Sequence, residues 1–427
     1  MGILGTSAAR ELTTLTSRPW GRVVAAFAVI FVGLAGRAVL DKILALRGGP
    51  EFVALWAQLQ SVVDLTSGVA LSGIGTGLTV MVAQATQPDT RRNLLRSALL
   101  LGLATSFPAM LLIGLAAAGL SAWLTGGALP PRLFALSASA GWITVVSGLL
   151  GAYWLGHRRL DRVLLLALAT TLPLVAVALT ASSTTMLQSL ILAQIVPALF
   201  ITAVLIWYVR THSHVHGGAG LAAPDRRQLA RYLPVGLAIG TLTPASILLV
   251  RSIVSNALSW SDAGLIQALW RSSDWITSVA AGVLALLFLP RFSAAHGTRR
   301  FAGELVRAGS AILIPAAVLL FLLLLNQKTV LATLYDTRFV LSDRAAAFFL
   351  MGDWIRIASW VFLYALFAMR RTVAIMAGEI FSLPLFAFLL YVFSDGLTLE
   401  RTGIIYLLTY LSYFVFNAAA TLRKPDH

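Results

Sequence analysis

The chain has 427 residues, of which 58% are hydrophobic and only 11% are charged, and its mean hydropathy is +0.85. This composition excludes a soluble globular protein, because soluble domains carry roughly 25% charged residues. The sequence contains no cysteine, which excludes a disulfide scaffold, and its surplus of apolar residues excludes a disordered chain. The remaining class is a membrane protein, with lipid as its solvent.

The formal net charge is +15, from 32 Lys and Arg against 17 Asp and Glu. A basic chain of this kind could bind nucleic acid if its cations formed one face of a folded domain. Here the cations instead fall in short clusters between long apolar runs, which is typical of membrane topology. We therefore expect no nucleic-acid partner.

Apolar runs long enough to cross ~30 Å of hydrocarbon recur twelve times along the chain. They are too continuously apolar for barrel strands, and a helix satisfies all its backbone groups within one segment in lipid. The sequence therefore predicts an all-α polytopic membrane protein with twelve transmembrane helices. We place them near residues 20–46, 60–83, 94–122, 133–156, 162–181, 186–209, 231–256, 264–290, 303–325, 345–369, 372–393 and 402–421.

The connections between these spans alternate between cation-rich and cation-poor. The even-numbered connections and both ends, with the first residues of the spans that follow them, hold 21 Lys and Arg, whereas the odd-numbered connections hold six. Cytoplasmic loops carry the excess of cations, so both termini are predicted to be cytoplasmic. The N-terminal sequence shows no cleavage site after a short apolar core, so we expect the first span to be retained.

A polar stretch separates six spans from six. The sequence predicts an N-terminal six-helix lobe over residues 1–209, a cytoplasmic linker over residues 210–230 and a C-terminal six-helix lobe over residues 231–427. Three histidines alternate in the linker, but no cysteine or carboxylate pair accompanies them. We interpret them as part of a solvated loop and expect no metal site. They are His212, His214 and His216.

The two lobes resemble each other in sequence. Shifting the second half back by 214 residues places Arg251 on Arg37 and residues 268–270 on residues 54–56, each Ala-Leu-Trp. An even number of spans per lobe predicts a parallel repeat with a pseudo-twofold axis along the membrane normal. Folds of this kind place the substrate between the lobes.

Ionisable side chains within apolar spans are costly and often mark a substrate or ion path. We take the cations as a candidate binding surface for an anionic cargo, because guanidinium binds phosphate oxygens through a bidentate fork. The candidate cations are Arg37, Lys42, Arg251, Arg271 and Arg356. The acids either couple ion movement or act as counter-ions, and they are Asp64, Asp274, Asp353 and Glu379.

Local ion pairs are the alternative explanation for most of these charges. Residues three or four apart are neighbours on a helix surface. Three pairs have this spacing: Arg37 with Asp41, Arg271 with Asp274, and Asp353 with Arg356. Arg251 differs, because its neighbours on both sides along the chain are apolar or hydroxyl residues. We therefore expect it to have a distant partner or an anionic ligand.

Signatures of catalysis are missing from the sequence. No glycine-rich loop ends in Lys followed by Ser or Thr, and neither G-x-S-x-G nor H-E-x-x-H occurs. The longest connection on the cation-poor side, near residues 326–344, is too short for an external catalytic domain. These observations favour a transporter without its own motor and without a cofactor.

Several local stretches carry a resemblance to a known family. They are residues 37–42 leading to 48–50, residues 72–77, residues 268–274 running to 288–292, and residues 352–356 followed by 377–379. In these stretches and in its span count, the chain resembles the Wzx-type polysaccharide flippases, which include O-antigen and common antigen translocases. These belong to the multidrug, oligosaccharidyl-lipid and polysaccharide exporter superfamily, whose fold is MATE-like. The resemblance covers most of the chain.

The resemblance implies a flippase of the bacterial inner membrane. It would move an undecaprenyl diphosphate-linked oligosaccharide from the cytoplasmic to the periplasmic leaflet by alternating access, for surface polysaccharide synthesis. The family's cationic lumen would map here onto Arg37, Arg251, Arg271 and Arg356. A polysaccharide polymerase and a chain-length regulator are the expected protein partners. The alternatives are a multidrug or cation antiporter of the same superfamily, and a non-transporting membrane component of polysaccharide assembly.

Overall fold

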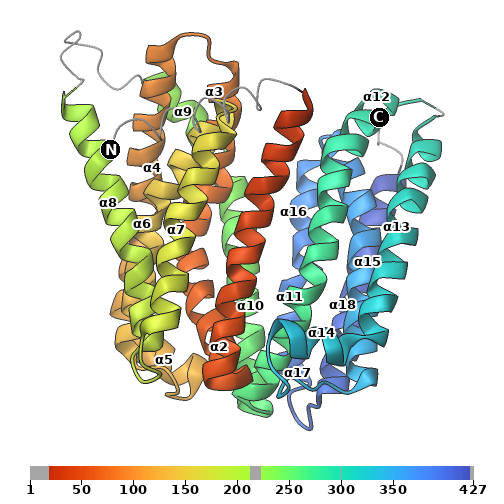
Figure 1. Cartoon of the computed structure of the whole chain (residues 1–427). Helices are drawn as coiled ribbons and strands as arrows, with labels where there is room; N and C mark the ends of the chain where they lie inside the picture. Colours follow the sequence, from red (N-terminus) through yellow and green to blue (C-terminus); the bar gives the residue numbers. More distant parts are fainter. Residues whose placement is uncertain (1–18, 212–222, 299, 424–427) are drawn as a thin grey trace. The chain divides into compact units, whose positions relative to one another are not determined.

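The computed structural model describes residues 19–211, 223–298 and 300–423, and within these ranges every regular element is a helix (Figure 1). The first part of the chain forms α2 (Pro19–Val69), the π-helix η1 (Ala70–Gly75), α3 (Thr76–Gln84), α4 (Pro88–Leu115), α5 (Ala117–Thr125), α6 (Pro131–Gly156), α7 (Leu160–Thr180) and α8 (Met186–Thr211). The middle forms α9 (Ala223–Ala230), α10 (Leu233–Ala257), α11 (Trp260–Val283), the π-helix η2 (Leu284–Phe288) and α12 (Leu289–Ala295). The last part forms α13 (Arg300–Leu325), α14 (Gln327–Leu334), α15 (Asp343–Ala368), α16 (Thr372–Ile380), α17 (Leu383–Val392) and α18 (Leu399–Leu422).

Helices long and apolar enough to cross a membrane dominate the described part of the chain. Ten such segments are present, and the first of them, Phe31–Gln84, is 54 residues long. A break at Gly49 in α2 divides this segment into two spans, and α10 adds a further helix of 25 residues. The described residues thus confirm the predicted all-α fold and are consistent with its twelve spans.

The connection between the first two spans is shorter than predicted. The sequence placed a loop between residues 46 and 60, whereas helix runs up to Gly49 and resumes at Pro50. Gly49 has φ 70° and ψ −162°, a conformation that residues with a side chain rarely adopt. Proline is well suited to a first helical turn because it has no amide hydrogen to leave unsatisfied. The Gly-Pro pair therefore reverses the chain without a loop.

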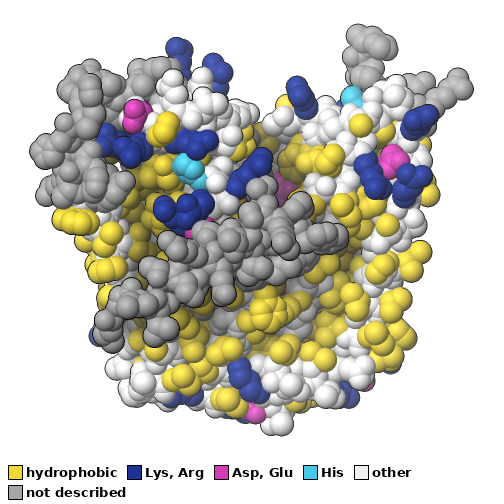
Figure 2. All heavy atoms as spheres, turned by 45° about the horizontal axis from the view of Figure 1, so that its top comes forward, with side chains coloured by type: hydrophobic (Ala, Val, Ile, Leu, Met, Phe, Trp, Pro, Cys, Tyr) yellow, Lys and Arg dark blue, Asp and Glu magenta, His cyan; other side chains and the backbone are white. Residues whose placement is uncertain are grey.

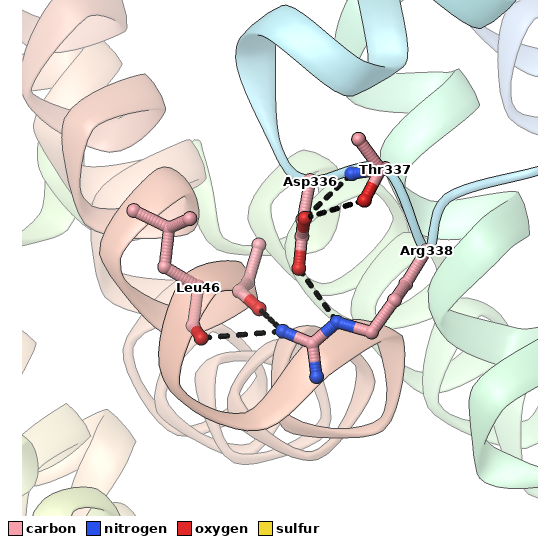
Figure 3. Close-up of polar contacts among 5 residues, drawn as sticks. Leu46, Asp336, Thr337 and Arg338 are labelled. Atoms are coloured by element: carbon pink, nitrogen blue, oxygen red, sulfur yellow. Dashed lines mark hydrogen bonds and ion pairs between the residues drawn. The ribbon is translucent and has the colours of Figure 1, made fainter.

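Arg338 binds the carbonyl groups left open at this break (Figure 3). Its Nη2 donates to the carbonyl oxygens of Ala45 at 2.7 Å and Leu46 at 3.2 Å. The last carbonyls of a helix lack intrahelical partners and carry partial negative charge, so a guanidinium is a suitable cap. Asp336 holds Arg338 in place by accepting from its Nε at 2.6 Å, and this bond lowers the pKa of Asp336.

The described residues divide into two units. Unit 1 contains residues 19–43, 59–123, 127–211 and 223–244, and unit 2 contains residues 44–58, 124–126 and the described residues from 245 to 423. α2 and α10 each contribute to both units. The predicted division at residues 210–230 stays a prediction, and the linker residues 212–222, with their three histidines, lie outside the described residues.

In unit 1, α4, α6, α7 and α8 run side by side (Figure 1). The buried core of this bundle combines η1 and α3 with α4 and α6, and it includes Ile74, Leu78, Leu94 and Leu149. Glycines allow a close helix contact beside it: a Cβ on Gly68 would overlap the carbonyl oxygen of Gly240 on α10. Small residues of this kind are typical of membrane helix interfaces.

In unit 2, α15 and α18 pack along their lengths. Gly352 on α15 makes room for Tyr406 on α18, since a Cβ on Gly352 would lie 2.5 Å from the ring. Tyr406 is also in ring contact with Phe349, Phe386 and Trp270, at centroid distances of 5.2 to 5.5 Å. This aromatic core fixes the rotation of α11, α15, α17 and α18 about their axes. It thereby positions charged side chains on α11 and α15.

Candidate functional site

Three charged side chains from two helices of unit 2 meet within the membrane-spanning part of the chain. We name Asp274, Asp353 and Arg356 the charged cluster. The Nη2 of Arg356 lies 3.2 Å from Asp353 Oδ1, 3.5 Å from Asp274 Oδ1 and 3.2 Å from the hydroxyl oxygen of Thr277. One guanidinium nitrogen of α15 therefore holds two residues of α11 and one of its own helix.

The two carboxylates of the charged cluster differ in their surroundings. The Asp353 side chain is 0% exposed, and it accepts a hydrogen bond of 2.7 Å from the Tyr406 hydroxyl. The Asp274 side chain is 46% exposed, and that of Arg356 is 15% exposed. Desolvating an ion pair costs several kcal/mol per ion, which good geometry and added hydrogen bonds must offset. The cluster is therefore enclosed at Asp353 and open at Asp274.

Aromatic rings flank the cation. The guanidinium carbon of Arg356 lies 5.4 Å from the ring centroid of Trp360 and 5.7 Å from that of Tyr410. Cations within about 6 Å of a ring centroid are attracted to the ring face. Together with the two carboxylates, these rings fix the position of a side chain that would otherwise be mobile.

Tyrosines on one face of α18 link the charged cluster to a second buried acid. Tyr406, Tyr410 and Tyr413 follow one another at i, i+4 and i+7, with ring centroids 4.8 and 6.2 Å apart. The Tyr413 hydroxyl donates to Glu379 Oε1 at 3.2 Å. A row of tyrosine rings in contact thus extends from Asp353 to Glu379.

Arg251 occupies a different buried place in unit 2. It is 6% exposed, its Nε donates to Gln267 Oε1 at 2.9 Å, and its Nη1 donates to the carbonyl oxygen of Ala57 at 2.9 Å. Gln58 lies beside it, with Oε1 at 3.5 Å, and donates to Ser252 on α10. The distant partners expected for Arg251 include neutral amide and carbonyl oxygens that connect α10 to α2 and α11.

The remaining candidate residues fall in both units. Arg271 is half-buried on α11 of unit 2. In unit 1, Arg37 and Asp64 are exposed, and Lys42 is half-buried. Arg37 and Arg251, aligned by the sequence repeat, thus have unlike surroundings. The structure brings together Asp274, Asp353 and Arg356, while the other candidates lie outside the charged cluster.

The uncharged residues of the site were not predicted from the sequence. Thr277, Tyr406 and Tyr410 contact the charged cluster, and Gln267 contacts Arg251. The tyrosines could have been found from the pattern of residues 399–422. Hydroxyl groups recur there every three or four residues, which places them on one face of a helix. As for metal ions, the described ranges contain no group of three or more His, Asp or Glu side chains able to hold one.

Solved structures of membrane transporters share this fold. An inward-facing multidrug resistance MATE family transporter of the MOP superfamily aligns with 94% of this chain and 96% of its own, at a TM-score of 0.64 and 14% identity. A MOP superfamily transporter from Pyrococcus furiosus aligns with 96% of both chains, at a TM-score of 0.63 and 14% identity. The fold is therefore that of MATE transporters.

Curated relatives lead from the class to a particular group. The chain is 23% identical over 397 residues to the Lipid III flippase of Escherichia coli strain K12, covering 90% of this chain and 93% of the relative. The Lipid III flippase of Shigella flexneri matches to the same extent. No family model matches the chain. These relatives confirm the resemblance to flippases of the exporter superfamily, and they are transporters rather than enzymes.

Proposed function

We propose that the chain is a flippase for an undecaprenyl diphosphate-linked oligosaccharide. In this proposal it moves the repeat unit from the cytoplasmic to the periplasmic leaflet of the bacterial inner membrane by alternating access, for O-antigen or common antigen synthesis. Two relatives named Lipid III flippase, matched over 90% of the chain, support this substrate class. A polysaccharide polymerase and a chain-length regulator would be its partners.

The observation that carries the proposal is the sharing of Arg356 between an enclosed and an open carboxylate. The side chain of Asp353 is fully buried, and its Oδ1 lies 3.2 Å from Arg356 Nη2. The side chain of Asp274 is 46% exposed, and its Oδ1 lies 3.5 Å from the same nitrogen. A diphosphate offers several acceptor oxygens for a guanidinium fork, and it can replace the longer, exposed contact without disturbing the buried pair. Arg356 would then bind the carrier's diphosphate while Asp353 keeps it in position.

Release of Asp274 from Arg356 would couple binding to a proton or a cation. A carboxylate whose cationic partner has turned to the diphosphate needs another counter-ion. Asp353 and Glu379, linked through the tyrosines of α18, are the second pair proposed for coupling, and Asp64 is a further candidate. In this scheme Asp274 and Asp353, which contact Arg356, respond to the substrate through it.

The other cations have assigned roles in the proposal. Arg271, half-buried one turn before Asp274, extends the cationic surface of unit 2 for the diphosphate, and Arg37 and Lys42 are the cations proposed for the anionic cargo in unit 1. Arg251 supports the site by joining α10 to α2 and α11 through Ala57 and Gln267. Arg251→Lys keeps the positive charge but should still lower export in part. An ammonium group cannot hold both oxygens with a planar fork.

Complementation tests the proposed function. In a strain that lacks its lipid-linked oligosaccharide flippase, this chain should relieve the accumulation of inward-facing carrier and restore surface glycan. Arg356→Gln should abolish both effects, whereas Arg307→Gln should keep them, because Arg307 is exposed and pairs with Glu304 on the same helix.

Two results would contradict the proposal. Drug or dye export without any effect on the carrier would identify a multidrug antiporter, in keeping with the multidrug resistance transporter that shares this fold. Glycan restored by a chain whose charged cluster has been neutralised would identify a non-transporting component of polysaccharide assembly. Membrane levels of each variant, measured by immunoblot, must match the parent chain for either conclusion.

A further inference from the structure

A separate cavity lies in unit 1, where α4, α6, α7 and α8 meet near the turn between α6 and α7. Its volume is about 540 Å³, within the roughly 300–1,000 Å³ typical of ligand sites. One wall is cationic and aromatic, and the other is aliphatic. Its lining residues include Arg92, Arg96, Trp154, Arg162, Leu165 and Phe200.

The cationic wall has little negative charge to balance it. Arg92 and Arg96 lie on α4 four residues apart, on one face, and Arg162 lies 5.9 Å from the ring centroid of Trp154. Among the described lining residues there is no carboxylate. Asp161, next to Arg162 in the chain, is occupied by two hydrogen bonds from Arg159, at 2.9 and 3.0 Å.

The ion pair between Arg92 and Asp89 is weak. Arg92 lies 4.0 Å from Asp89, with side chains that are 55% and 90% exposed, and exposed pairs of this kind contribute about 0–1 kcal/mol. Three guanidinium groups thus line one cavity whose described lining residues include no carboxylate. A phosphate group matches them, because arginine binds its oxygens through charge-assisted hydrogen bonds.

The aliphatic wall continues onto the surface of the membrane-spanning helices. Leu165, Phe200, Val204 and Trp207 line the cavity and are each at least 45% exposed. They lie on α7 and α8, two of the segments apolar enough to span a membrane. A ligand that fits both walls has an anionic head and a hydrocarbon chain, which a soluble anion lacks.

The cations lie near the starts of their helices, where a lipid headgroup would meet them. Arg92 and Arg96 lie in the first turns of α4, and Arg162 lies in the first turn of α7. Figure 2 shows clusters of Lys and Arg side chains beside hydrophobic side chains on the face turned forward. Basic pockets between membrane helices bind anionic headgroups.

We propose that this cavity binds an anionic phospholipid of the surrounding leaflet, with its phosphate against Arg92, Arg96 and Arg162 and an acyl chain along α7 and α8. The proposal is independent of the flippase function, because the cavity lies in unit 1 and the charged cluster lies in unit 2. Bound lipid would join α4 to α7, a helix with a single fully buried residue, Ala178.

Native mass spectrometry and thermal unfolding of the purified full chain test the proposal, with phosphatidylglycerol as the probe and phosphatidylcholine of equal chain length for comparison. Phosphatidylglycerol should bind selectively and raise the unfolding temperature. Arg96→Gln with Arg162→Gln should weaken its binding roughly 25-fold, about fivefold for each arginine. The matched control, Arg291→Gln with Arg300→Gln, changes two exposed cations outside the cavity and should bind as the parent does.

Other outcomes overturn the proposal. Displacement of the lipid by inorganic phosphate or glycerol phosphate at equal concentration would indicate a free-phosphate site. Preference for undecaprenyl phosphate would indicate a site for the carrier itself. A second variant keeps the test valid where the arginine changes impair folding: Ala169→Phe fills the aliphatic wall without altering charge. It should weaken phosphatidylglycerol binding, and unchanged binding would contradict the assignment.

Discussion

At the scale of single residues, the enclosed carboxylate of Asp353 shows how charge is tolerated inside a membrane-spanning helix. The side chain has no exposed surface, and Arg356 at 3.2 Å and the Tyr406 hydroxyl at 2.7 Å stabilise it. Both partners come from helices held by the same aromatic core. The carboxylate therefore depends on packing as well as on charge.

Removal of the cation should destabilise the chain unless the acid is also neutralised. Arg356→Gln leaves Asp353 charged and enclosed, which costs about 3–5 kcal/mol when one member of a buried pair is removed. Arg356→Gln combined with Asp353→Asn should recover much of the loss, because no buried charge remains. Thermal unfolding in detergent measures both effects. Equal unfolding temperatures for the single and double variants would show that the pair is not coupled.

His157 provides a second residue-scale prediction, at the turn between α6 and α7. Burial and the nearby cations Arg91, Arg162 and Arg159 lower its pKa below the ordinary 6.5, and Arg91 Nη1 lies 3.4 Å from Nδ1. Arg91→Gln removes a positive charge and should therefore raise this pKa. Histidine NMR titration, with His157→Asn for assignment, measures it.

The sign of the associated pH effect follows from proton binding. Because the pKa of His157 is lower in the folded than in the unfolded chain, the unfolded chain binds more protons as pH falls through about 6.5. His157 should therefore reduce stability at acidic pH, and less so in Arg91→Gln. An Arg307→Gln control should leave the pKa unchanged, and an unchanged pKa in Arg91→Gln would refute the electrostatic explanation.

At the scale of helices, close backbone contacts between glycines organise unit 1. Gly68 in α2 faces Gly240 in α10, and Gly73 in η1 faces Gly236, where a Cβ would lie 3.1 Å from the Gly236 Cα. Residues 236–240 form a G-x-x-x-G sequence, and such pairs let membrane helices approach until their backbones touch. The hydropathy of α10 alone does not indicate which helix it contacts.

A bulky residue at this contact should separate the helices. Gly68→Leu should destabilise the chain by about 1–3 kcal/mol or more, the usual cost of overpacking. Gly114→Leu is the matched control, because a Cβ on this helical glycine of α4 meets nothing within 4 Å. Unfolding temperature and membrane yield report the difference. Similar values for the two variants would disprove a tight α2–α10 contact.

At the scale of the whole molecule, the number of spans and the distribution of cations predict the orientation. An even number of spans returns the chain to the side on which it started, and the 21-to-6 division of cations assigns that side to the cytoplasm. The topology follows from the charge of the connections, because this charge sets the orientation of the spans during membrane insertion, before the helices pack.

Reporter fusions check this orientation. A periplasm-dependent phosphatase should be active after Gly127 or Asp395 and silent after Gly218 or Arg300. A cytoplasm-dependent reporter at the same four positions should give the opposite pattern and serves as the control. Activity of the phosphatase at Arg300 and silence at Gly127 would reverse the assigned orientation.

The sequence alone determined the class of fold, because hydropathy and span length are properties read along a single chain. It also placed Asp353 and Arg356 on one helix face, since i,i+3 spacing fixes that proximity wherever a helix forms. The expectation of a loop between the first two spans was wrong. Gly49 is the one non-helical residue between them, and helix resumes at Pro50.

Only the tertiary structure decided which charges share a site. Asp274 joins Arg356 from a helix about 80 residues earlier in the chain, and Arg251 reaches Ala57, 194 residues away. Such contacts depend on how each helix is rotated about its axis. In this chain that rotation is set by glycine contacts and by the packing of Tyr406 with Trp270, Phe349 and Phe386, which a one-dimensional pattern of hydropathy does not contain.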